Sequence, residues 1–254
     1  MAVTPEERRA ELARARERRS VELIEREALS PGVARFRFAL REGEALHHAP
    51  GQYVNVYLPG AEGEELSRSY SLAAGPAPGG DVFELGVTRV EGGAGSTALH
   101  GLEVGDRVVV DGPWGVFTHE RAPADAPRLY VATGTGLTPI RAMLERDLAT
   151  VGGPPITLLF GCRRAEDQLW QDQWEAAAAR DPRFRYEVTL SRPDAAWEGR
   201  SGYVQTHLDE VLGRLEGTPH AFICGMRRMI DAVRGQLKEA HGFDRKRIHT
   251  ERYD

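Results

Sequence analysis

The run Arg68-Ser69-Tyr70-Ser71 gathers a guanidinium, an aromatic ring and two hydroxyls within four residues. On an extended strand, Arg68 and Tyr70 lie on the same face, because side chains alternate from one side to the other. Arg68 can fork onto a phosphate, and Tyr70 offers its ring to a flat aromatic ligand. Ser71 can hydrogen-bond a ring nitrogen of that ligand, and Ser69 belongs to the same candidate set. The run therefore predicts a site for a phosphorylated aromatic cofactor.

A turn of small residues, Gly93-Ala94-Gly95-Ser96-Thr97, follows this strand and is expected to open a short helix over 96–100. Small residues, free backbone N–H groups and hydroxyls suit a diphosphate. The candidate ligands in the turn are Gly93, Gly95, Ser96 and Thr97. Each motif alone is also typical of an exposed strand or an ordinary glycine turn, but the two together favour a shared cofactor.

A second glycine-rich turn, Gly134-Thr135-Gly136-Leu137-Thr138-Pro139, lies between an expected strand and an expected helix. Its N–H groups and the helix dipole suit the pyrophosphate of a dinucleotide, with Thr135, Gly136, Thr138 and Pro139 as the candidate contacts. It is not the Rossmann fingerprint, because Pro139 stands where the third glycine would be. The turn predicts a nucleotide site of another type.

The elements that position the first site have a period of two from about residue 20 to 120. Alternating runs at 33–38, 53–57 and 82–85 are separated by turns such as Pro50-Gly51 and Gly92-Gly93. Several short strands with turn signals between them indicate an antiparallel β-barrel. Before it, Thr4-Pro5-Glu6-Glu7 is a capping box, so residues 1–19 are expected to hold a charged helix.

The period changes after a Pro- and Ala-rich linker at 121–127. Strands are expected at 129–132, 156–160, 184–190 and 221–224, and helices at 137–148, 165–180, 203–212 and 226–240. Strands that alternate with helices predict a doubly wound parallel sheet, which binds ligands at the carboxyl ends of its strands. The expected architecture is a β-barrel domain at 20–120 followed by an α/β domain at 128–254.

Composition excludes several classes of protein. The net charge of -5 argues against a nucleic-acid binder, and no apolar run approaches a membrane span. Residues 1–120 carry 13 arginines against 19 acidic residues, whereas residues 121–254 carry 20 basic against 19 acidic residues. An acidic partner would therefore dock near basic clusters of the second half. Eight histidines show no zinc spacing, and two cysteines without a signal peptide indicate a reducing cytoplasm.

Over about residues 20 to 254 the chain resembles the ferredoxin–NADP(H) reductase superfamily. The family's Arg-x-Tyr-Ser motif matches Arg68, Tyr70 and Ser71, which implies an arginine on the flavin phosphate, a tyrosine stacked on the isoalloxazine and a serine near N5. In the barrel half, Gly93 and Ser96 match the family's diphosphate turn, and Gly112-Pro113-Trp114-Gly115 match the end of its barrel. In the second half, the family's nucleotide turn is matched by Gly134, Thr135, Gly136 and Pro139. The family's Cys-Gly pair near the nicotinamide is matched by Cys224-Gly225. The resemblance implies a flavin-binding barrel followed by a nicotinamide-binding domain.

Two finer matches point to a subclass. Four residues, Ser191, Arg192, Arg200 and Tyr203, resemble the patch that holds the 2′-phosphate of NADP(H). Glu198 lies nearby and leaves NAD(H) open, because a carboxylate suits the free ribose hydroxyl. The ending Glu251-Arg252-Tyr253-Asp254 resembles the Glu-x-Tyr ending of plant-type members, whose tyrosine covers the second flavin face. Here Asp254 follows that tyrosine.

The expected flavin is FAD, with FMN as the alternative, because Glu91-Gly92 replaces an aromatic residue that stacks on adenine in plant-type members. The resemblance implies hydride transfer between nicotinamide C4 and flavin N5, next to Ser71, Cys224, Glu251 and Tyr253. The implied partner is a separate one-electron carrier, ferredoxin or flavodoxin. The alternatives are an NADH-dependent reductase component of an oxygenase, a free-flavin reductase, and a non-catalytic flavin-binding electron-transfer or sensor subunit.

Overall fold

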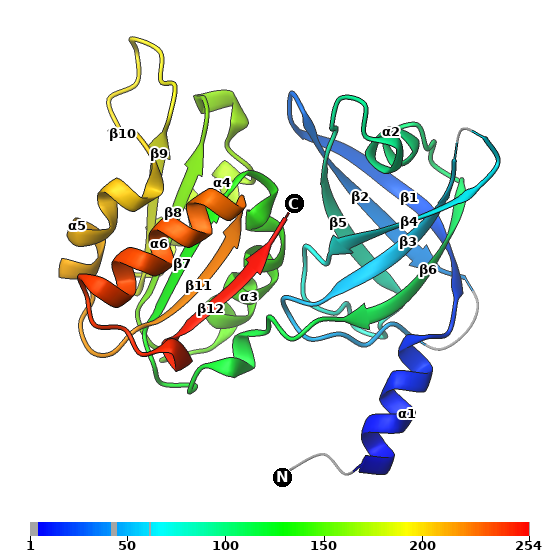
Figure 1. Cartoon of the computed structure of the whole chain (residues 1–254), viewed down its shortest axis with the longest axis horizontal. Coiled ribbons are helices and arrows are strands. Elements are labelled where there is room, and N and C mark those ends of the chain that lie inside the picture. The colour runs from blue at the N-terminus through cyan, green and yellow to red at the C-terminus, as the bar shows by residue number, and fades with distance from the viewer. Residues whose placement is uncertain (1–4, 42–44, 61, 254) are drawn as a thin grey trace.

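The chain folds around two six-stranded sheets that lie side by side (Figure 1). The structure is a computed structural model and describes residues 5–41, 45–60 and 62–253. The first sheet is antiparallel and the second is parallel, which confirms the fold class expected from the sequence. None of the described helices combines the length and the apolar character needed to cross a membrane.

The first sheet has the strand order β4-β3-β6-β1-β2-β5. Its strands are β1 (Arg19–Ser30), β2 (Val33–Leu40), β3 (Tyr53–Pro59), β4 (Glu65–Ser71), β5 (Val82–Thr88) and β6 (Arg107–Trp114). A bridge between Leu72 and Leu85 brings the two edge strands together, so the sheet curls into a barrel. The short helix α2 (Ala94–His100) lies after β5.

The alternation of apolar and polar residues in the sequence corresponds to side chains that point alternately into and out of this barrel. In β3, Val54, Val56 and Leu58 are fully or almost fully buried, while the residues between them are partly exposed. The same alternation buries Phe36 and Phe38 in β2. The strands that the alternating runs predicted are present, and β1 and β6 extend the sheet beyond them.

The N-terminal helix α1 (Pro5–Ala15) projects from the barrel and is held at its C-terminal end (Figure 1). The Arg19 guanidinium donates to the carbonyl oxygens of Arg14, at 3.0 Å, and of Gly112, at 3.1 Å. The buried Arg19 side chain thus adds a second donor to a terminal helix carbonyl that also accepts from the Glu17 N–H. Thr4 of the expected capping box lies outside the described residues.

The second sheet has the order β10-β9-β8-β7-β11-β12, and each of its paired strands is parallel. The strands are β7 (Arg128–Thr133), β8 (Ile156–Cys162), β9 (Phe184–Leu190), β10 (Arg200–Ser201), β11 (His220–Gly225) and β12 (Ile248–Arg252). The helices are α3 (Leu137–Ala149), α4 (Gln171–Arg180), α5 (Leu208–Gly213) and α6 (Arg227–Glu239). Tyr130 and Ala132 of β7 pack with α3 and α4, whereas Leu129 and Val131 pack with α5 and α6, as in a doubly wound sheet.

Three expectations from the sequence need correction. The helix expected over 165–180 is broken, because Trp170 adopts a left-handed backbone conformation (φ 53°) and separates a 3₁₀ turn at Ala165–Asp167 from α4. The helix expected over 203–212 begins as a 3₁₀ turn at Val204–His207 and becomes α-helical only in α5. No strand was expected after the helix at 226–240, whereas Ile248–Arg252 form the edge strand β12 beside β11.

Gly235 in the interior of α6 offers a test of how the helix is packed. A Cβ placed there meets nothing within 4 Å. Alanine favours a helix over glycine by up to about 1 kcal/mol, so Gly235→Ala is expected to raise the free energy of unfolding by about 0.5–1 kcal/mol. Urea unfolding followed by circular dichroism measures this gain, and a loss of stability would contradict the open space around the residue.

Candidate functional site

The two sheets meet where their sequence motifs lie. The Tyr253 hydroxyl, just after β12, donates to the Ser71 hydroxyl oxygen at the end of β4, at 2.6 Å. On the other side, Thr88 of β5 and Thr135 hydrogen-bond through their hydroxyls at 3.1 Å. Thr138 donates to the Gly86 carbonyl oxygen at 3.4 Å. The fold thus brings the Arg-Ser-Tyr-Ser strand, the second glycine-rich turn and the C-terminal strand to one interface.

Arg68, Ser69, Tyr70 and Ser71 form the last part of β4, an edge strand paired with β3. Arg68 is exposed, and its guanidinium donates to the Ser67 carbonyl oxygen at 2.8 Å. Among the described residues no carboxylate pairs with it, so it remains available for a phosphate. Tyr70 is half-buried, and burial raises the pKa of its hydroxyl. Ser69 donates to Asn55 Oδ1 at 2.7 Å, on the opposite face of the strand.

The first glycine turn packs against Arg68. A Cβ added to Gly95 would lie 2.5 Å from Arg68 Cγ, so a larger residue here would force the Arg68 side chain to move. Ser96 is buried, and its hydroxyl accepts from the Val90 N–H and donates to the Gly93 carbonyl oxygen, both at 3.1 Å. Thr97 is exposed on α2. Ser96 therefore organises the turn in this structure, and the expected contact of the turn with a diphosphate stays a prediction.

The second glycine-rich turn follows β7 and packs against the end of β11. A Cβ added to Gly136 would lie 2.8 Å from Gly225 Cα and still closer to the carbonyl oxygen of Cys224. The absence of a side chain lets the two turns touch through their backbones. Thr138 and Pro139 are buried, while Gly134 is exposed and Thr135 half-buried. Of the four predicted contacts for a pyrophosphate, Thr135 is thus the most accessible.

Glu251 lies beside Cys224, because the two residues are paired in register on β12 and β11. Burial raises the pKa of the Glu251 carboxyl to about 7. Its Oε2 atom is buried, and no atom of residues 5–41, 45–60 or 62–253 forms a hydrogen bond with it. Burial, and then the neighbouring Glu251 carboxylate, raise the pKa of the Cys224 thiol well above its ordinary value. Cys224 is therefore a neutral thiol at pH 7, and Glu251 is a carboxyl group that can hold or release a proton there.

A cavity of about 380 Å³ opens after β8 and β9, where Arg164, Glu166, Arg192, Pro193 and Asp194 line it. Ser191 adjoins it, since its N–H donates to the Cys162 carbonyl oxygen at 3.0 Å. Arg192 is exposed and in the described residues has no carboxylate partner. The cavity lies at the carboxyl ends of two parallel strands, where such sheets bind ligands.

Arg200 and Tyr203 do not line this cavity. The Arg200 guanidinium forms ion pairs with Glu187, at 3.1 Å, and with Glu210. Tyr203 is exposed. Arg164 does line the cavity, and sequence reasoning missed it. Its position directly after a parallel strand was the available signal, because such positions gather at the ligand-binding edge of the sheet.

Arg141 is a second residue that the sequence did not single out. This buried side chain of α3 donates to the Ala73 carbonyl oxygen at 2.8 Å and pairs with Glu84 at 3.0 Å. Its guanidinium also stacks over the Trp170 ring, 4.9 Å from the ring centre. Arg141 thereby ties the second sheet to the first next to the predicted site. No group of three or more His, Cys, Asp or Glu side chains in the described parts of the chain is placed to hold a metal ion.

Comparison with known proteins decides the family. Residues 20–119 match the oxidoreductase FAD-binding domain, and residues 130–235 match the oxidoreductase NAD-binding domain. The chain is 46% identical over 231 residues to "Ferredoxin--NADP reductase B" of Sorangium cellulosum. The aligned segment covers 89% of this chain and 93% of that protein. The chain belongs to the ferredoxin–NADP(H) reductase superfamily.

Other members of this superfamily are reductases that serve different systems. The chain is 32% identical over 234 residues to "Phenol hydroxylase P5 protein" of Acinetobacter pittii, covering 91% of this chain but 64% of that longer protein. Among solved structures, the cytochrome b5 reductase domain of Ulva prolifera nitrate reductase superposes with a TM-score of 0.81 at 27% identity, covering 94% of this chain and 98% of that one. The chain is a flavoprotein oxidoreductase with the fold of these reductases.

The residues at the interface fit both cofactors that the superfamily uses. The exposed Arg68 guanidinium is free to bind a phosphate, and the glycine at position 95 keeps the neighbouring turn close to it. On the nicotinamide side, the Oε2 atom of Glu251 is a buried acceptor without a hydrogen-bond partner among the residues that the structure describes. A buried polar atom without a partner is costly, so a bound group that donates to it would relieve that cost.

Proposed function

We propose that this enzyme transfers electrons between NADP(H) and a one-electron carrier protein such as ferredoxin or flavodoxin, with FAD as the bound cofactor. The contact between Tyr253 and Ser71 carries this proposal, because it joins the C-terminal strand of the nicotinamide unit to the flavin strand. A relative at 46% identity whose name is a ferredoxin–NADP reductase supports the choice of substrate and carrier.

FAD supplies the redox chemistry when bound, since it accepts two electrons as a hydride and passes them on singly. The protein would orient it: Arg68 would bind a phosphate, Tyr70 would stack on one face of the ring system and Tyr253 would cover the other. In this structure the Ser71 hydroxyl oxygen accepts a hydrogen bond from the Tyr253 hydroxyl. Glu251 lies beside Cys224, where its carboxylate would accept a hydrogen bond from the nicotinamide carboxamide.

The proposed specificity for NADP(H) rests on the cavity after β8 and β9. Its two arginines, Arg164 and Arg192, offer guanidinium groups that suit the 2′-phosphate. Arg192 is the stronger candidate, because Arg164 forms an ion pair with Glu166 at 3.6 Å. Ser191 and Tyr203 stay in the proposed site as neighbours of that phosphate. Arg200 is now the weaker candidate, because ion pairs with Glu187 and Glu210 already engage its guanidinium.

We also propose the domain boundaries of the protein and its location in the cell. Residues 20–120 form the flavin domain, residues 121–127 the linker, and residues 128–254 the nicotinamide domain, close to the two segments that match the family descriptions. Cys162 and Cys224 are both free thiols, which supports a reducing cytoplasm. The carrier is expected to be acidic, because the excess of basic residues lies in the second domain.

A second candidate function is the reductase component of an oxygenase, with NADH as the donor. It is favoured by two relatives, "Phenol hydroxylase P5 protein" and "Toluate 1,2-dioxygenase electron transfer component", the latter from Pseudomonas putida at 34% identity. The chain covers 64% and 58% of their lengths, so it matches only part of each. Nucleotide preference separates this function from the first.

The deciding experiment is anaerobic titration of the purified yellow protein with NADPH and then with NADH, followed by the loss of flavin absorbance. NADPH is expected to bind more tightly. Arg192→Gln is expected to raise the Kd of NADPH about 10- to 100-fold and to leave that of NADH unchanged, because it removes a charged hydrogen bond to the 2′-phosphate.

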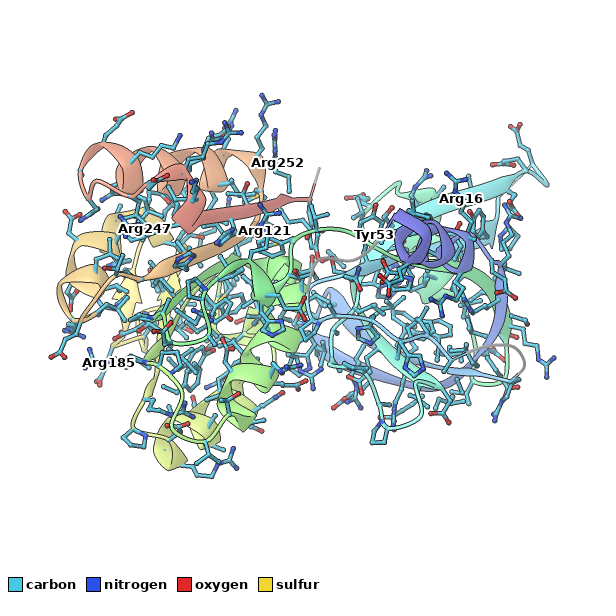
Figure 2. All side chains as sticks on the ribbon, turned by 90° about the horizontal axis from the view of Figure 1, so that it is seen from below. Arg16, Tyr53, Arg121, Arg185, Arg247 and Arg252 are labelled. Carbon is cyan, nitrogen blue, oxygen red and sulfur yellow. The ribbon has the colours of Figure 1, made fainter. Side chains whose placement is uncertain are left out.

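Arg185→Gln is the matched control. Arg185 is exposed at the far edge of the second sheet, where its guanidinium donates to the Arg214 carbonyl oxygen (Figure 2). This variant makes the same change of charge and is expected to bind both nucleotides normally. Preferential reduction by NADH, with no effect of Arg192→Gln, would instead support the oxygenase reductase, and a protein that takes up no FAD would refute both functions.

A further inference from the structure

A second cavity lies away from the predicted nucleotide and flavin residues. It has a volume of about 270 Å³ and is formed by the segment after β6, by α6 and by the C-terminal strand. Its lining consists of Val116, Phe117, Arg121, Arg234, Arg245, Ile248, His249 and Thr250. None of these residues belongs to the motifs that define the flavin or nicotinamide sites.

Three arginines from separate elements line this cavity. Arg121 ends the 3₁₀ turn His119–Arg121, Arg234 lies on α6, and Arg245 begins the 3₁₀ turn Arg245–Arg247. No acidic residue lines the cavity, and none of the three arginines forms an ion pair with a described residue. Within the described part of the chain, the Arg121 guanidinium donates only to the Val116 carbonyl oxygen, at 3.3 Å.

This arrangement differs from the rest of the protein, where arginines are commonly paired. Arg141 pairs with Glu84 and Glu145, and Arg200 pairs with Glu187 and Glu210. Three like charges that face one small cavity repel each other, and a bound anion removes that repulsion. The protein has more acidic than basic residues overall, so the unpaired cluster is not a consequence of excess positive charge.

His249, which also lines the cavity, adds no charge to it. His249 is buried and packs on the Phe222 ring, with ring centres 4.6 Å apart, and its Nε2 lies 3.1 Å from Nδ1 of His220. Burial, and then the nearby His220 and Arg121, lower the pKa of His249 to about 4. The imidazole is therefore neutral at pH 7, and the three arginines are the charged residues that line the cavity.

We propose that this cavity is a binding site for a small oxyanion that carries two or more negative charges, such as a phosphate or a dicarboxylate. Guanidinium forks match the geometry of phosphate and carboxylate oxygens, and the exposed Thr250 adds a hydroxyl donor. The cavity volume accommodates such an ion and excludes a whole dinucleotide. The anion joins the segment between the two sheets, the last helix and the last strand.

The site acts on the enzyme through the C-terminal strand. Ile248, His249 and Thr250 of β12 line the cavity, and Glu251 and Tyr253 follow in the same segment. An anion held by Arg121, Arg234 and Arg245 fixes β12 against the linker and α6. It thereby stabilises the segment whose tyrosine contacts Ser71. The ligand is thus an effector that acts from outside the nucleotide cavity after β8 and β9.

The experiment measures the melting temperature of the FAD-loaded enzyme in inorganic phosphate and in sodium chloride of equal ionic strength. Saturating NADP⁺ is present in both, so that phosphate does not act at the nucleotide site. Phosphate at about ten times its Kd is expected to raise the melting temperature by about 3–6 °C above the chloride value. Arg234→Gln and Arg245→Gln are each expected to abolish most of this rise.

Arg16→Gln is the matched control. In Figure 2, Arg16 lies by α1 on the first unit, whereas Arg121 and Arg247 lie near the C-terminal strand of the second. This variant is expected to keep the full phosphate response. The side-chain NMR signals of His249 are expected to shift with phosphate in the wild type and not in Arg245→Gln. An equal response of all four proteins, or no response to phosphate, overturns the proposal. Loss of carrier reduction alone in the two cavity variants overturns it in favour of a protein-docking surface.

Discussion

Gly136→Ala is expected to lower the free energy of unfolding by about 3 kcal/mol and to weaken nicotinamide nucleotide binding by about 100-fold. The new Cβ would lie 2.8 Å from Gly225 Cα and closer still to the Cys224 carbonyl oxygen. Both neighbours are backbone atoms between a buried strand and a helix, so neither can turn aside as a flexible side chain would. The turn after β7 must move, and with it Thr135 and the N-terminus of α3.

Gly134→Ala separates this steric effect from a general loss of glycine. Gly134 lies two residues earlier in the same turn, has a φ of 53°, and a Cβ there meets nothing within 4 Å. The variant is expected to lose only about 1 kcal/mol, the cost of a left-handed conformation for alanine. Urea unfolding and nucleotide titration measure both effects. If Gly136→Ala were no more harmful than Gly134→Ala, the close approach of the two turns would be wrong.

The sequence predicted the architecture because burial leaves a periodic trace. The alternation at 53–57 became β3 with Val54 and Val56 inside the barrel, and the apolar run at 156–160 became the buried strand β8. The strand expected at 184–190 coincides with β9. In each case the hydrophobic effect acts on the local pattern, so local reading was sufficient.

The failures arose where tertiary packing overrides the local pattern. Trp170 breaks the helix expected over 165–180, and it packs against the Arg141 guanidinium, which belongs to a distant part of the chain. The short strand β12 ends in the charged residues Glu251 and Arg252, and its sequence shows no alternation of apolar and polar residues that would predict a strand. It forms because the edge of β11 offers unpaired backbone groups, with which β12 pairs in parallel. Neither partner is visible to a reading of neighbouring residues.

The candidate site divides in the same way. Short motifs showed where backbone and small residues must come close, as at Gly95 and Gly136. They could not show which charged side chains share a cavity. Arg200 matched the expected phosphate patch but lies outside the cavity and pairs with Glu187 and Glu210, whereas Arg164 lines the cavity together with Arg192 without having been predicted. Which side chains share a cavity depends on residues far apart in sequence, so only the folded chain distinguishes Arg164 from Arg200.

Glu251→Gln is expected to make the protein more stable and less active. Burial raises the pKa of this carboxyl from an ordinary value of 4.5 to about 7. Between these two values the folded protein binds the proton and the unfolded chain does not, so the stability of the wild type falls as pH rises from about 4.5 to 7. Glutamine has no proton to lose, and Glu251→Gln is therefore expected to exceed the wild type by roughly 3 kcal/mol at pH 8.

The difference in stability should vanish below about pH 4.5, where both side chains are neutral. Glu239→Gln, at the exposed end of α6, is the control and is expected to follow the wild type at each pH. Urea unfolding of the protein from pH 4 to pH 8 measures these curves. A destabilised Glu251→Gln at pH 8, or a curve parallel to that of the wild type, would show that the Glu251 carboxyl is not held in a costly buried state.

The same substitution is expected to slow hydride transfer from NADPH about 10- to 100-fold, because a hydrogen bond to a charged group is worth about 1.5–3 kcal/mol. Stopped-flow reduction of the bound flavin should show an inflection near pH 7 in the wild type and none in Glu251→Gln. A buried carboxyl with an orphaned oxygen costs stability in the resting protein. This cost is explained if the bound nicotinamide donates a hydrogen bond to that oxygen. Glu251→Gln should therefore gain stability and lose rate of hydride transfer together.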